Sequence, residues 1–333
     1  MSGTHAPYVP GRVRFGPMRA IVLHGEELRL EERPDPVPGS HEVLVDAPYA
    51  ALNPADLAQR AGRYPAPPGA PQDVPGLEVT GRVVACGDAV LGLQVGDRVF
   101  GLVGGGGLAD RVAVHERHVV AVPERLDDEE ATAVPEAFLT AHDAVVTQAD
   151  LGHGDVLLVN GASGGVGTAA VQIGKLVGAT VIGTARSAEA RRRLAELGAE
   201  AVAPDDAAER VRAAGGADVI IELIGGPNLA GNLEVLSMKG RIVIVGTGAG
   251  ADAELSLRAL MGRRGRIFGT MLRARPLEEK AAAVQAFGHA LLPALADGRA
   301  RGIVDRVFPA EQVNEAFDYM AQPGKFGKVL LKF

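Results

Sequence analysis

The chain has 333 residues, a formal net charge of −7 and an isoelectric point near 5.7, and 47% of its residues are hydrophobic and 23% charged. This balance is that of a globular protein, no apolar run reaches the length of about 20 residues that crosses a bilayer, and the acidity argues against general binding to nucleic acid. The single cysteine, Cys86, excludes an internal disulfide and a zinc site built from several cysteines. We therefore expect a soluble, cytoplasmic protein of about two domains.

The first part of the chain is rich in short β-like runs. Residues 1–17 lack the continuous apolar stretch that a secretory signal requires, and we interpret them as a loose extension. From residue 18 to about residue 126, short apolar runs such as RAIVL, HEVLVDA and DRVAV alternate with turn residues. This pattern predicts a small antiparallel barrel or sandwich.

The pattern changes after about residue 135. The apolar runs DVLLVN, ATVIGTA, ADVIIEL and GRIVIVG alternate with helical segments rich in Ala, Leu and Arg, which predicts a doubly wound parallel sheet built from βαβ units. The last part of the chain returns to strands and one short helix, and we expect it to rejoin the first domain. The prediction is an α/β protein with a β-rich domain at residues 18–138 and 303–333 and a dinucleotide-binding domain at residues 139–302.

The segment GASGGVG, at residues 161–167, places four glycines within seven positions. A buried strand precedes it, and a helical pattern and a second strand follow, which is the context of a dinucleotide site. Bare backbone would let a pyrophosphate approach the helix N-terminus, where free N–H groups and the helix dipole favour negative charge. A tight turn without a ligand is the alternative. The residues expected to line the pyrophosphate are Gly161, Ala162, Ser163, Gly164, Gly165 and Val166.

The end of the second strand bears on which dinucleotide is bound. NAD enzymes usually carry an acid there, about 20 residues after the glycines, but this chain has Ala185 followed by Arg186 and Ser187. A guanidinium and a hydroxyl suit a 2′-phosphate, and charge-assisted hydrogen bonds of roughly 1.5 to 3 kcal/mol predict a preference for NADPH. Arg186 could instead be an ordinary solvated charge, and Arg191, a further candidate, could be helix surface. Asp205, near the third strand, would oppose a 2′-phosphate.

Three motifs carry a family resemblance. The segments NGASGGVGTAAVQ at 160–172, ALNPADLAQRAGRYPAPPG at 51–69 and VPGLEVTG at 74–81 resemble the zinc-independent quinone oxidoreductase branch of the medium-chain dehydrogenase/reductase superfamily, and the similarity extends over residues 18–333. Zinc-dependent relatives have a GHExxG motif, whereas this chain has Leu77 in place of the histidine, so no metal site is expected. The resemblance implies a GroES-like catalytic domain, a Rossmann cofactor domain, a homodimer, and hydride transfer from NADPH to a quinone or another α,β-unsaturated carbonyl.

The resemblance also implies catalytic residues. Tyr64 matches a tyrosine near the nicotinamide and could donate a hydrogen bond to a carbonyl oxygen, or could simply pack on the neighbouring prolines. Asn53 matches a position facing the cofactor, but Asn53, Pro54 and Asp56 also fit N-cap, N1 and N3 of a helix. Thr140 matches a threonine beside the nicotinamide, or is a plain helix residue. The remaining cofactor-binding positions that the resemblance implies are Gly183, Gly246, Thr247, Met271 and Leu272.

Two other functions share these features. An enoyl reductase acting on thioester-linked chains would use the same hydride geometry on a C=C bond. A non-catalytic NADPH-binding redox sensor would keep the glycine loop without turnover, and the acidic balance argues against an RNA partner for it.

Overall fold

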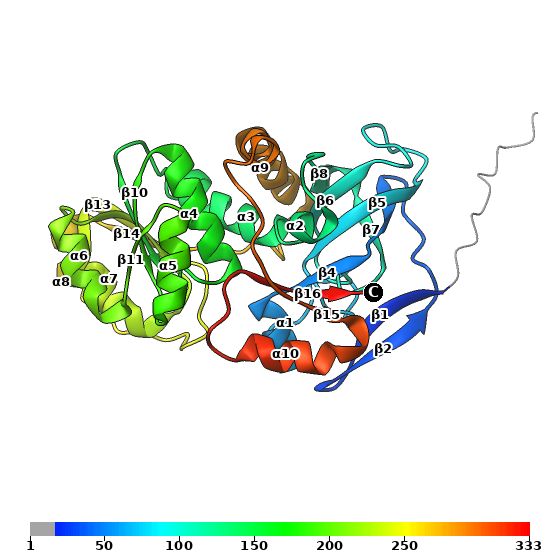
Figure 1. Ribbon diagram of the computed structural model, residues 1–333, viewed down its shortest axis with the longest axis horizontal. Coiled ribbons are helices and arrows are strands. Elements are labelled where there is room, and N and C mark those ends of the chain that lie inside the picture. The colour runs from blue at the N-terminus through cyan, green and yellow to red at the C-terminus, as the bar shows by residue number, and fades with distance from the viewer. Residues whose placement is uncertain (1–16) are drawn as a thin grey trace, which may run out of the picture.

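The computed structural model describes residues 17–333, so the predicted N-terminal extension lies outside the described residues except for its last position. Figure 1 shows two lobes, a parallel sheet wrapped in helices at one end and a β-rich lobe at the other, with helices α3 (Pro135–His142) and α9 (Leu277–Asp297) between them. The predicted class, a β-rich lobe beside a doubly wound parallel sheet, is confirmed.

The largest sheet of the β-rich lobe is antiparallel, with five strands in the order β7-β3-β5-β6-β8. Along β7 every second residue is buried, because successive side chains point to opposite faces and one face packs on a core of valines. The five strands are β3 (Glu42–Asp46), β5 (Glu78–Cys86), β6 (Arg98–Leu102), β7 (Arg111–His115) and β8 (Val119–Ala121). The hairpin and short helices of this lobe are β1 (Met18–His24), β2 (Glu27–Arg33), α1 (Pro54–Arg60), η1 (Glu116–His118) and α2 (Asp128–Thr132).

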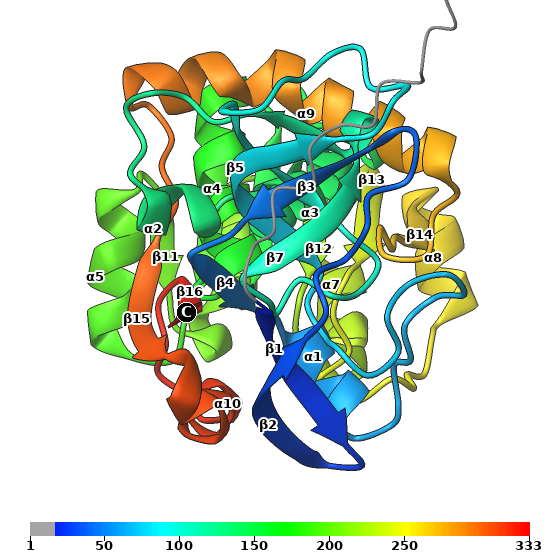
Figure 2. The same cartoon turned by 90° about the vertical axis from the view of Figure 1, so that its right-hand side faces the viewer.

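The end of the chain returns to the β-rich lobe. Strand β16 (Lys328–Lys332) pairs antiparallel with β4 (Tyr49–Leu52) and parallel with β15 (Val304–Pro309). Helix α10 (Val313–Ala321), which follows the short η5 (Ala310–Gln312), buries its apolar face against this sheet and lies beside the β1–β2 hairpin in Figure 2. Residues near position 328 are thereby placed next to residues near position 53.

The parallel sheet has the order β11-β10-β9-β12-β13-β14, so the chain order reverses between β9 and β12. All five residues of β9 are buried, as expected for a strand that is covered on both faces. The strands are β9 (Val156–Asn160), β10 (Thr180–Thr184), β11 (Glu200–Val202), β12 (Ala217–Glu222), β13 (Leu236–Ile244) and β14 (Arg266–Gly269). The other helical elements of this lobe are η2 (Asp143–Gln148), α4 (Gly165–Val177), α5 (Ala188–Glu196), η3 (Pro204–Asp206), α6 (Ala207–Ala213), η4 (Gly226–Asn228), α7 (Leu229–Val235) and α8 (Leu257–Arg263).

One hydrophobic core runs through both lobes. The rings of Phe100 in β6 and Phe287 in α9 lie 6.0 Å apart, and Phe138 in α3 belongs to the same buried cluster as the central strand β9. The polar residues at the junction of the lobes are therefore held by apolar packing around them.

Candidate active site

The glycine loop follows β9 and opens α4 at the carboxyl edge of the parallel sheet, where the strand order reverses. Gly161 has a φ of +78°, and a Cβ there would lie 2.7 Å from Ile224 Cδ1. A Cβ on Gly167 would lie 2.6 Å from backbone atoms of Ala162. The fold itself therefore requires glycine at both positions.

Gly164 differs from these two glycines. It is the N-cap of α4 with a φ of −77°, and a Cβ placed on it would meet nothing within 4 Å. Neither strain nor packing requires glycine here, and the two remaining reasons for it are the N-cap position, which favours glycine, and the close approach of a ligand to bare backbone. Because the 13-residue helix α4 begins here, the loop fits a pyrophosphate group.

Other predicted loop residues are packed against the protein. Ala162 is fully buried, and a Cβ on Gly183 in β10 would lie 3.1 Å from the Ala162 Cβ. Val166 is partly buried against the main core. These three residues fix the position of the loop against the sheet.

The C-terminal segment lies directly against the glycine loop. The Gly327 N–H donates to the Ser163 carbonyl oxygen at 2.9 Å. A Cβ on Gly165 would lie 2.6 Å from Lys328 Cδ. The β-rich lobe and the start of α4 are therefore in contact through β16.

The end of β10 holds one arginine without a partner. The Arg186 side chain is exposed, and its guanidinium makes no hydrogen bond or ion pair within residues 17–333. The Ser187 hydroxyl instead caps α5 by accepting the Ala190 N–H at 3.1 Å. Arg191 turns its Nη1 back to the carbonyl oxygens of Ala185 at 3.0 Å and Arg186 at 2.7 Å. Of the predicted ribose-end residues, Arg186 alone is left with an uncommitted charge.

A second cation, Lys325, approaches Arg186 from the C-terminal segment. Burial is the main reason that the pKa of Lys325 is lowered, Asp305 acts against this shift, and the charge of Arg186 adds to it. The neighbouring Phe326 ring lies 4.0 Å from the Arg193 guanidinium carbon on α5. Sequence reasoning missed Lys325, which is 139 positions from Arg186 (325 − 186).

The other predicted cofactor positions also follow strands at this edge. Gly246 and Thr247 come after β13, and a Cβ on Gly246 would lie 2.5 Å from the Leu223 carbonyl oxygen. Met271 and Leu272 follow β14, with Met271 54% exposed and Leu272 4% exposed. The fold brings all four to the edge that carries the glycine loop.

Glu222, at the end of β12, is fully buried in a network of donors that sequence reasoning missed. Its carboxylate accepts hydrogen bonds of 2.7 to 3.2 Å from the N–H groups of Ile224 and Gly225 and from the side-chain amides of Asn160, Asn228 and Asn232. These bonds hold the carboxyl ends of β9 and β12 together.

Polar side chains also gather where the β-rich lobe meets α3, and we call Asn53, Asp56, Glu78, Glu136 and Lys328 the Glu78 cluster. Glu78 Oε1 forms a buried ion pair with Lys328 Nζ at 2.8 Å and accepts from Asn53 Nδ2 at 2.7 Å. Glu78 Oε2 accepts the Glu136 N–H at 2.8 Å, at the start of α3. Both Glu78 oxygens are thus occupied.

Asn53 stands at the N-cap of α1, as its sequence pattern predicts, but its side chain is turned into the cluster. Lys328 Nζ donates to Asn53 Oδ1 at 2.5 Å. Asp56 accepts the N–H groups of Asn53 at 2.7 Å and Gly76 at 3.0 Å. Burial nevertheless raises the pKa of Asp56 to about 6.

The Glu136 carboxyl and the Thr140 hydroxyl meet one turn apart on α3. Burial, followed by the charge of Glu78, raises the pKa of Glu136 to about 7, although Lys328 acts in the opposite direction. Thr140 Oγ1 donates to Glu136 Oε1 at 3.2 Å. The nearby His142 is buried, and burial lowers its pKa, which suits a packed neutral histidine.

Tyr64 is held by Arg273, which sequence reasoning did not identify. Arg273 is 5% exposed and donates to the carbonyl oxygens of Gly104 at 2.8 Å and Tyr64 at 2.9 Å and to Gln59 Oε1 at 2.5 Å. Its guanidinium carbon lies 5.0 Å from the centre of the Tyr64 ring. The Tyr64 hydroxyl makes no hydrogen bond in the described part of the chain, and burial raises the pKa of this phenol.

The loop after β14 is fastened to the end of α3. Asp143 forms an ion pair with Arg275 at 2.7 Å and accepts from the Thr270 hydroxyl at 2.7 Å. Arg275 Nε also donates to the Met271 carbonyl oxygen at 2.9 Å. This arrangement fixes the backbone on both sides of the predicted position Leu272.

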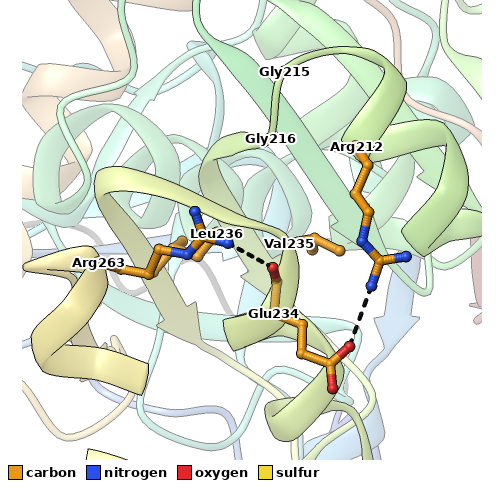
Figure 3. A pocket seen from close by; sticks show the side chains of 7 residues that line it. All are labelled: Arg212, Gly215, Gly216, Glu234, Val235, Leu236 and Arg263. Carbon is orange, nitrogen blue, oxygen red and sulfur yellow. Dashed lines mark hydrogen bonds and ion pairs between the residues drawn. The ribbon is translucent and has the colours of Figure 1, made fainter. Parts of the chain in front are cut away.

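Two surface hollows lie away from these residues. One, of about 460 Å³, lies between β8 and α9 and includes Val119, Ala121, Gly288 and His289 in its lining. The other, of about 150 Å³, is shown in Figure 3, where Arg212 pairs with Glu234 at 3.2 Å and Arg263 donates to the Glu234 carbonyl oxygen at 3.0 Å. Neither hollow is lined by a predicted site residue.

The described residues offer no candidate for a metal site or a membrane span. Residues 17–333 contain no group of three His, Cys, Asp or Glu side chains arranged to hold a metal ion. Leu77 is buried. Over the same residues, no helix has both the length and the apolar character needed to cross a membrane.

Comparison with known proteins gives two family matches and several similar proteins. Residues 39–124 match the family described as alcohol dehydrogenase GroES-like domain, and residues 165–288 match the family described as zinc-binding dehydrogenase. The quinone oxidoreductase of Lama guanicoe is 34% identical over 304 residues, which cover 89% of this chain and 90% of that protein. The acryloyl-coenzyme A reductase of Sulfurisphaera tokodaii is 27% identical over 347 residues, which cover 95% and 100%.

Solved structures give the same picture. The quinone oxidoreductase of Thermus thermophilus, determined also in complex with NADPH, is 34% identical with a TM-score of 0.83, covering 95% of this chain and 100% of that one. The CurK enoyl reductase is 27% identical with a TM-score of 0.83, covering 95% and 99%.

Proposed function

The chain belongs to the quinone oxidoreductase branch of the medium-chain dehydrogenase/reductase superfamily, and we propose that it is a zinc-independent reductase that uses NADPH to reduce a quinone or another α,β-unsaturated carbonyl. The observation that carries the proposal is Gly164, whose bare backbone is unexplained by strain or packing and opens α4 at the strand-order reversal. Residues 139–302 would hold the cofactor, and residues 18–138 with 303–333 the substrate.

A preference for NADPH over NADH is supported by the charges at the end of β10. Arg186 is exposed and uncommitted, and Lys325 lies near enough for the two charges to interact. A 2′-phosphate between two cations would form charge-assisted hydrogen bonds that a 2′-hydroxyl cannot match. Asp205, which would oppose this group, is exposed in η3 beyond the neighbouring strand β11.

Zinc independence is supported by the residues at the position of the metal-binding motif. Although the family matched by residues 165–288 is named for zinc, Leu77 offers no ligand atom, and Lys328 places an ammonium group on the adjacent Glu78. A buried ammonium ion beside this carboxylate opposes a divalent cation there.

The chemistry then falls to a few side chains. The reduced nicotinamide would supply a hydride, and the free Tyr64 hydroxyl would donate a hydrogen bond to the developing oxyanion of the acceptor. Thr140 would lie beside the nicotinamide. Asn53 would hold Lys328 and Glu78 and so help to fix the β-rich lobe against the cofactor domain. The backbone of Met271 and Leu272 would hold the nicotinamide end.

Calorimetry with NADPH and NADH, followed by cofactor oxidation with a panel of quinones, enones and enoyl thioesters, tests the proposal. We expect tight NADPH binding, weaker NADH binding, and turnover of quinones. Absence of binding by either cofactor would refute the proposal, and binding without any turnover would instead favour a redox sensor.

Reduction of an enoyl thioester is the second candidate. The similarity to an acryloyl-coenzyme A reductase and to the CurK enoyl reductase, over at least 95% of the chain, favours it. Turnover of enoyl thioesters at a higher kcat/KM than any quinone would decide for this candidate.

We further propose a homodimer and a cytoplasmic location. Strand β14 is an edge strand, and Leu257 and Met261 on the preceding helix α8 are 66% and 76% exposed. An open strand edge beside exposed apolar side chains supports pairing with a second copy, which sedimentation can test. The single cysteine, Cys86, suits a reducing compartment.

A further inference from the structure

Under the proposed function, the acceptor needs a proton as well as a hydride. A hydride carries two electrons and one hydrogen, so the reduced carbonyl compound is left as an anion. Tyr64 is a weak acid here, because burial raises the pKa of its phenol. A carboxyl group with a pKa nearer neutrality is a better proton donor than this phenol.

Helix α3 lies between the glycine loop and the loop after β14. Near its start, the Ala137 Cβ is 3.6 Å from where a Cβ on Gly165 would stand. Just beyond its end, Asp143 accepts from the Thr270 hydroxyl at 2.7 Å. Thr140 is located on α3 between these two contacts, so we place it along the path from the pyrophosphate loop to the predicted nicotinamide loop.

Glu136 is the carboxyl group of the Glu78 cluster that contacts this hydroxyl, at 3.2 Å. Both oxygens of Glu78 are occupied, and Asp56 is fully buried on two backbone N–H groups. Glu136, unlike these two residues, is only partly buried as a residue, although its carboxyl group lies deep enough for burial to raise its pKa.

The charges around Glu136 leave it able to hold or release a proton near neutral pH. Burial and Glu78 raise its pKa, Lys328 lowers it, and the result is about 7. The titratable and charged groups that face it are Asp56 on α1, Tyr64 after α1, Glu78 on β5, Arg273 after β14, Lys280 on α9 and Lys328 on β16.

We propose that Glu136 holds the proton that the reduced substrate takes up and delivers it through the Thr140 hydroxyl. When Glu136 is protonated, its O–H donates to Thr140 Oγ1, the reverse of the bond in which the hydroxyl donates to the carboxylate, and the hydroxyl proton turns to the substrate. The O–H bond of the Glu136 carboxylic acid then breaks as its proton moves to Thr140 Oγ1. The hydroxyl proton of Thr140 moves at the same time to the anionic substrate, where a new bond to hydrogen forms. The Glu136 carboxylate then takes a proton from water, which restores the starting state.

The test compares wild type with Glu136→Gln, Thr140→Val and Thr140→Ser, with Glu315→Gln on the exposed face of α10 as the control. Only the protonated carboxyl can deliver, so wild-type kcat/KM should fall as the pH rises through about 7. Glu136→Gln and Thr140→Val should lower kcat/KM by roughly a hundredfold or more and abolish this pH dependence. Thr140→Ser and Glu315→Gln should keep the pH dependence of the wild type. Calorimetry should give NADPH affinities for Glu136→Gln and Glu315→Gln within about twofold of wild type, where a tenfold change corresponds to about 1.4 kcal/mol.

A second readout does not need turnover. The infrared C=O band of a protonated carboxyl, taken as wild type minus Glu136→Gln without cofactor, should vanish as the pH rises through about 7. A band that titrates near 4.5, or a pH dependence that survives in Glu136→Gln, would overturn the inference. If Glu136→Gln does not fold, the pH profile of Thr140→Val decides in its place. If the Glu136 carboxyl band titrated near 7 but the protein reduced no quinone, enone or enoyl thioester, the proposed function would be contradicted, and the delivery step with it.

Discussion

Two glutamates that are removed from bulk water show how this fold treats a carboxylate in opposite ways. Glu222 accepts hydrogen bonds from two backbone N–H groups and three asparagine amides. Glu136 has one hydroxyl partner and faces the carboxylates of Glu78 and Asp56. The first group is surrounded by hydrogen-bond donors that hold it in place, whereas the second is left short of donors and can change its charge. Two other pairs differ in a similar way. Arg191 bonds two carbonyl oxygens, whereas Arg186 has no partner among the described residues. Packing requires glycine at position 167, whereas a Cβ on Gly164 would meet nothing within 4 Å.

Removal of the satisfied carboxylate should have the largest effect. Glu222→Ala removes the acceptor of five donors, three of them buried and two partly buried, so we expect a loss of about 3 to 5 kcal/mol in the free energy of unfolding. Urea denaturation measures this loss, and Glu234→Ala on the surface of α7 is the control. A loss below about 0.5 kcal/mol, which is typical of surface changes, would show that the network is not needed by the fold.

The unsatisfied carboxylate should instead make stability depend on pH. Because burial raises the pKa of Glu136 from 4.5 to about 7, the folded protein keeps a proton that the unfolded chain has lost. The stability due to this group is therefore greatest below about 4.5 and falls as the pH rises to about 7. Glu136→Gln cannot ionise, so its stability relative to wild type should increase by up to about 3 kcal/mol across this range. Urea midpoints at about pH 5 and about pH 8 measure the change, and parallel behaviour of the two proteins would contradict it.

The arginine pair should separate cofactor preference from helix structure. Arg186→Ala removes an uncommitted charge, so we expect NADPH affinity to fall ten- to hundredfold, which is about 1.4 to 2.7 kcal/mol, with NADH affinity unchanged. Arg191→Ala removes a side chain that already bonds two carbonyl oxygens, so the ratio of the two affinities should stay within about twofold. Calorimetry with both cofactors decides, and an equal loss of NADH affinity in Arg186→Ala would sink the assignment.

The sequence predicts best the parts of the molecule that are formed by residues close together in the chain. The strand, glycine loop and helix around Gly164 are continuous in the chain, and their apolar periodicity and turn residues indicate them directly. The parallel sheet and the β-rich lobe follow from the same periodicity. Gly164 could thus be proposed before any coordinates, although only the structure shows that Gly161 and Gly167 have other reasons to be glycine.

The Glu78 cluster could not be predicted in this way, because its partners are far apart in the chain. Lys328 lies 250 positions from Glu78 and 275 positions from Asn53. No periodicity relates such residues, and the shift in the pKa of Glu136 depends on burial that arises only when the lobes pack. In the segment GLEV, the sequence draws attention to Leu77, which replaces a metal ligand. The residue that organises the cluster is the next one, Glu78.

The glycine pair should give the smallest effects and the cleanest separation. Gly167→Ala places a Cβ 2.6 Å from backbone atoms, so we expect a loss of about 1 to 2 kcal/mol in stability, measured by thermal or urea unfolding. Gly164→Ala meets no protein atom within 4 Å and has an ordinary φ, so its stability should change by less than about 1 kcal/mol. Its methyl group would occupy the space proposed for the pyrophosphate, so NADPH affinity should fall about tenfold or more. If Gly164→Ala bound NADPH as tightly as wild type, the open backbone at this position would be a surface feature of the turn, and the phosphate would have to lie elsewhere along the loop.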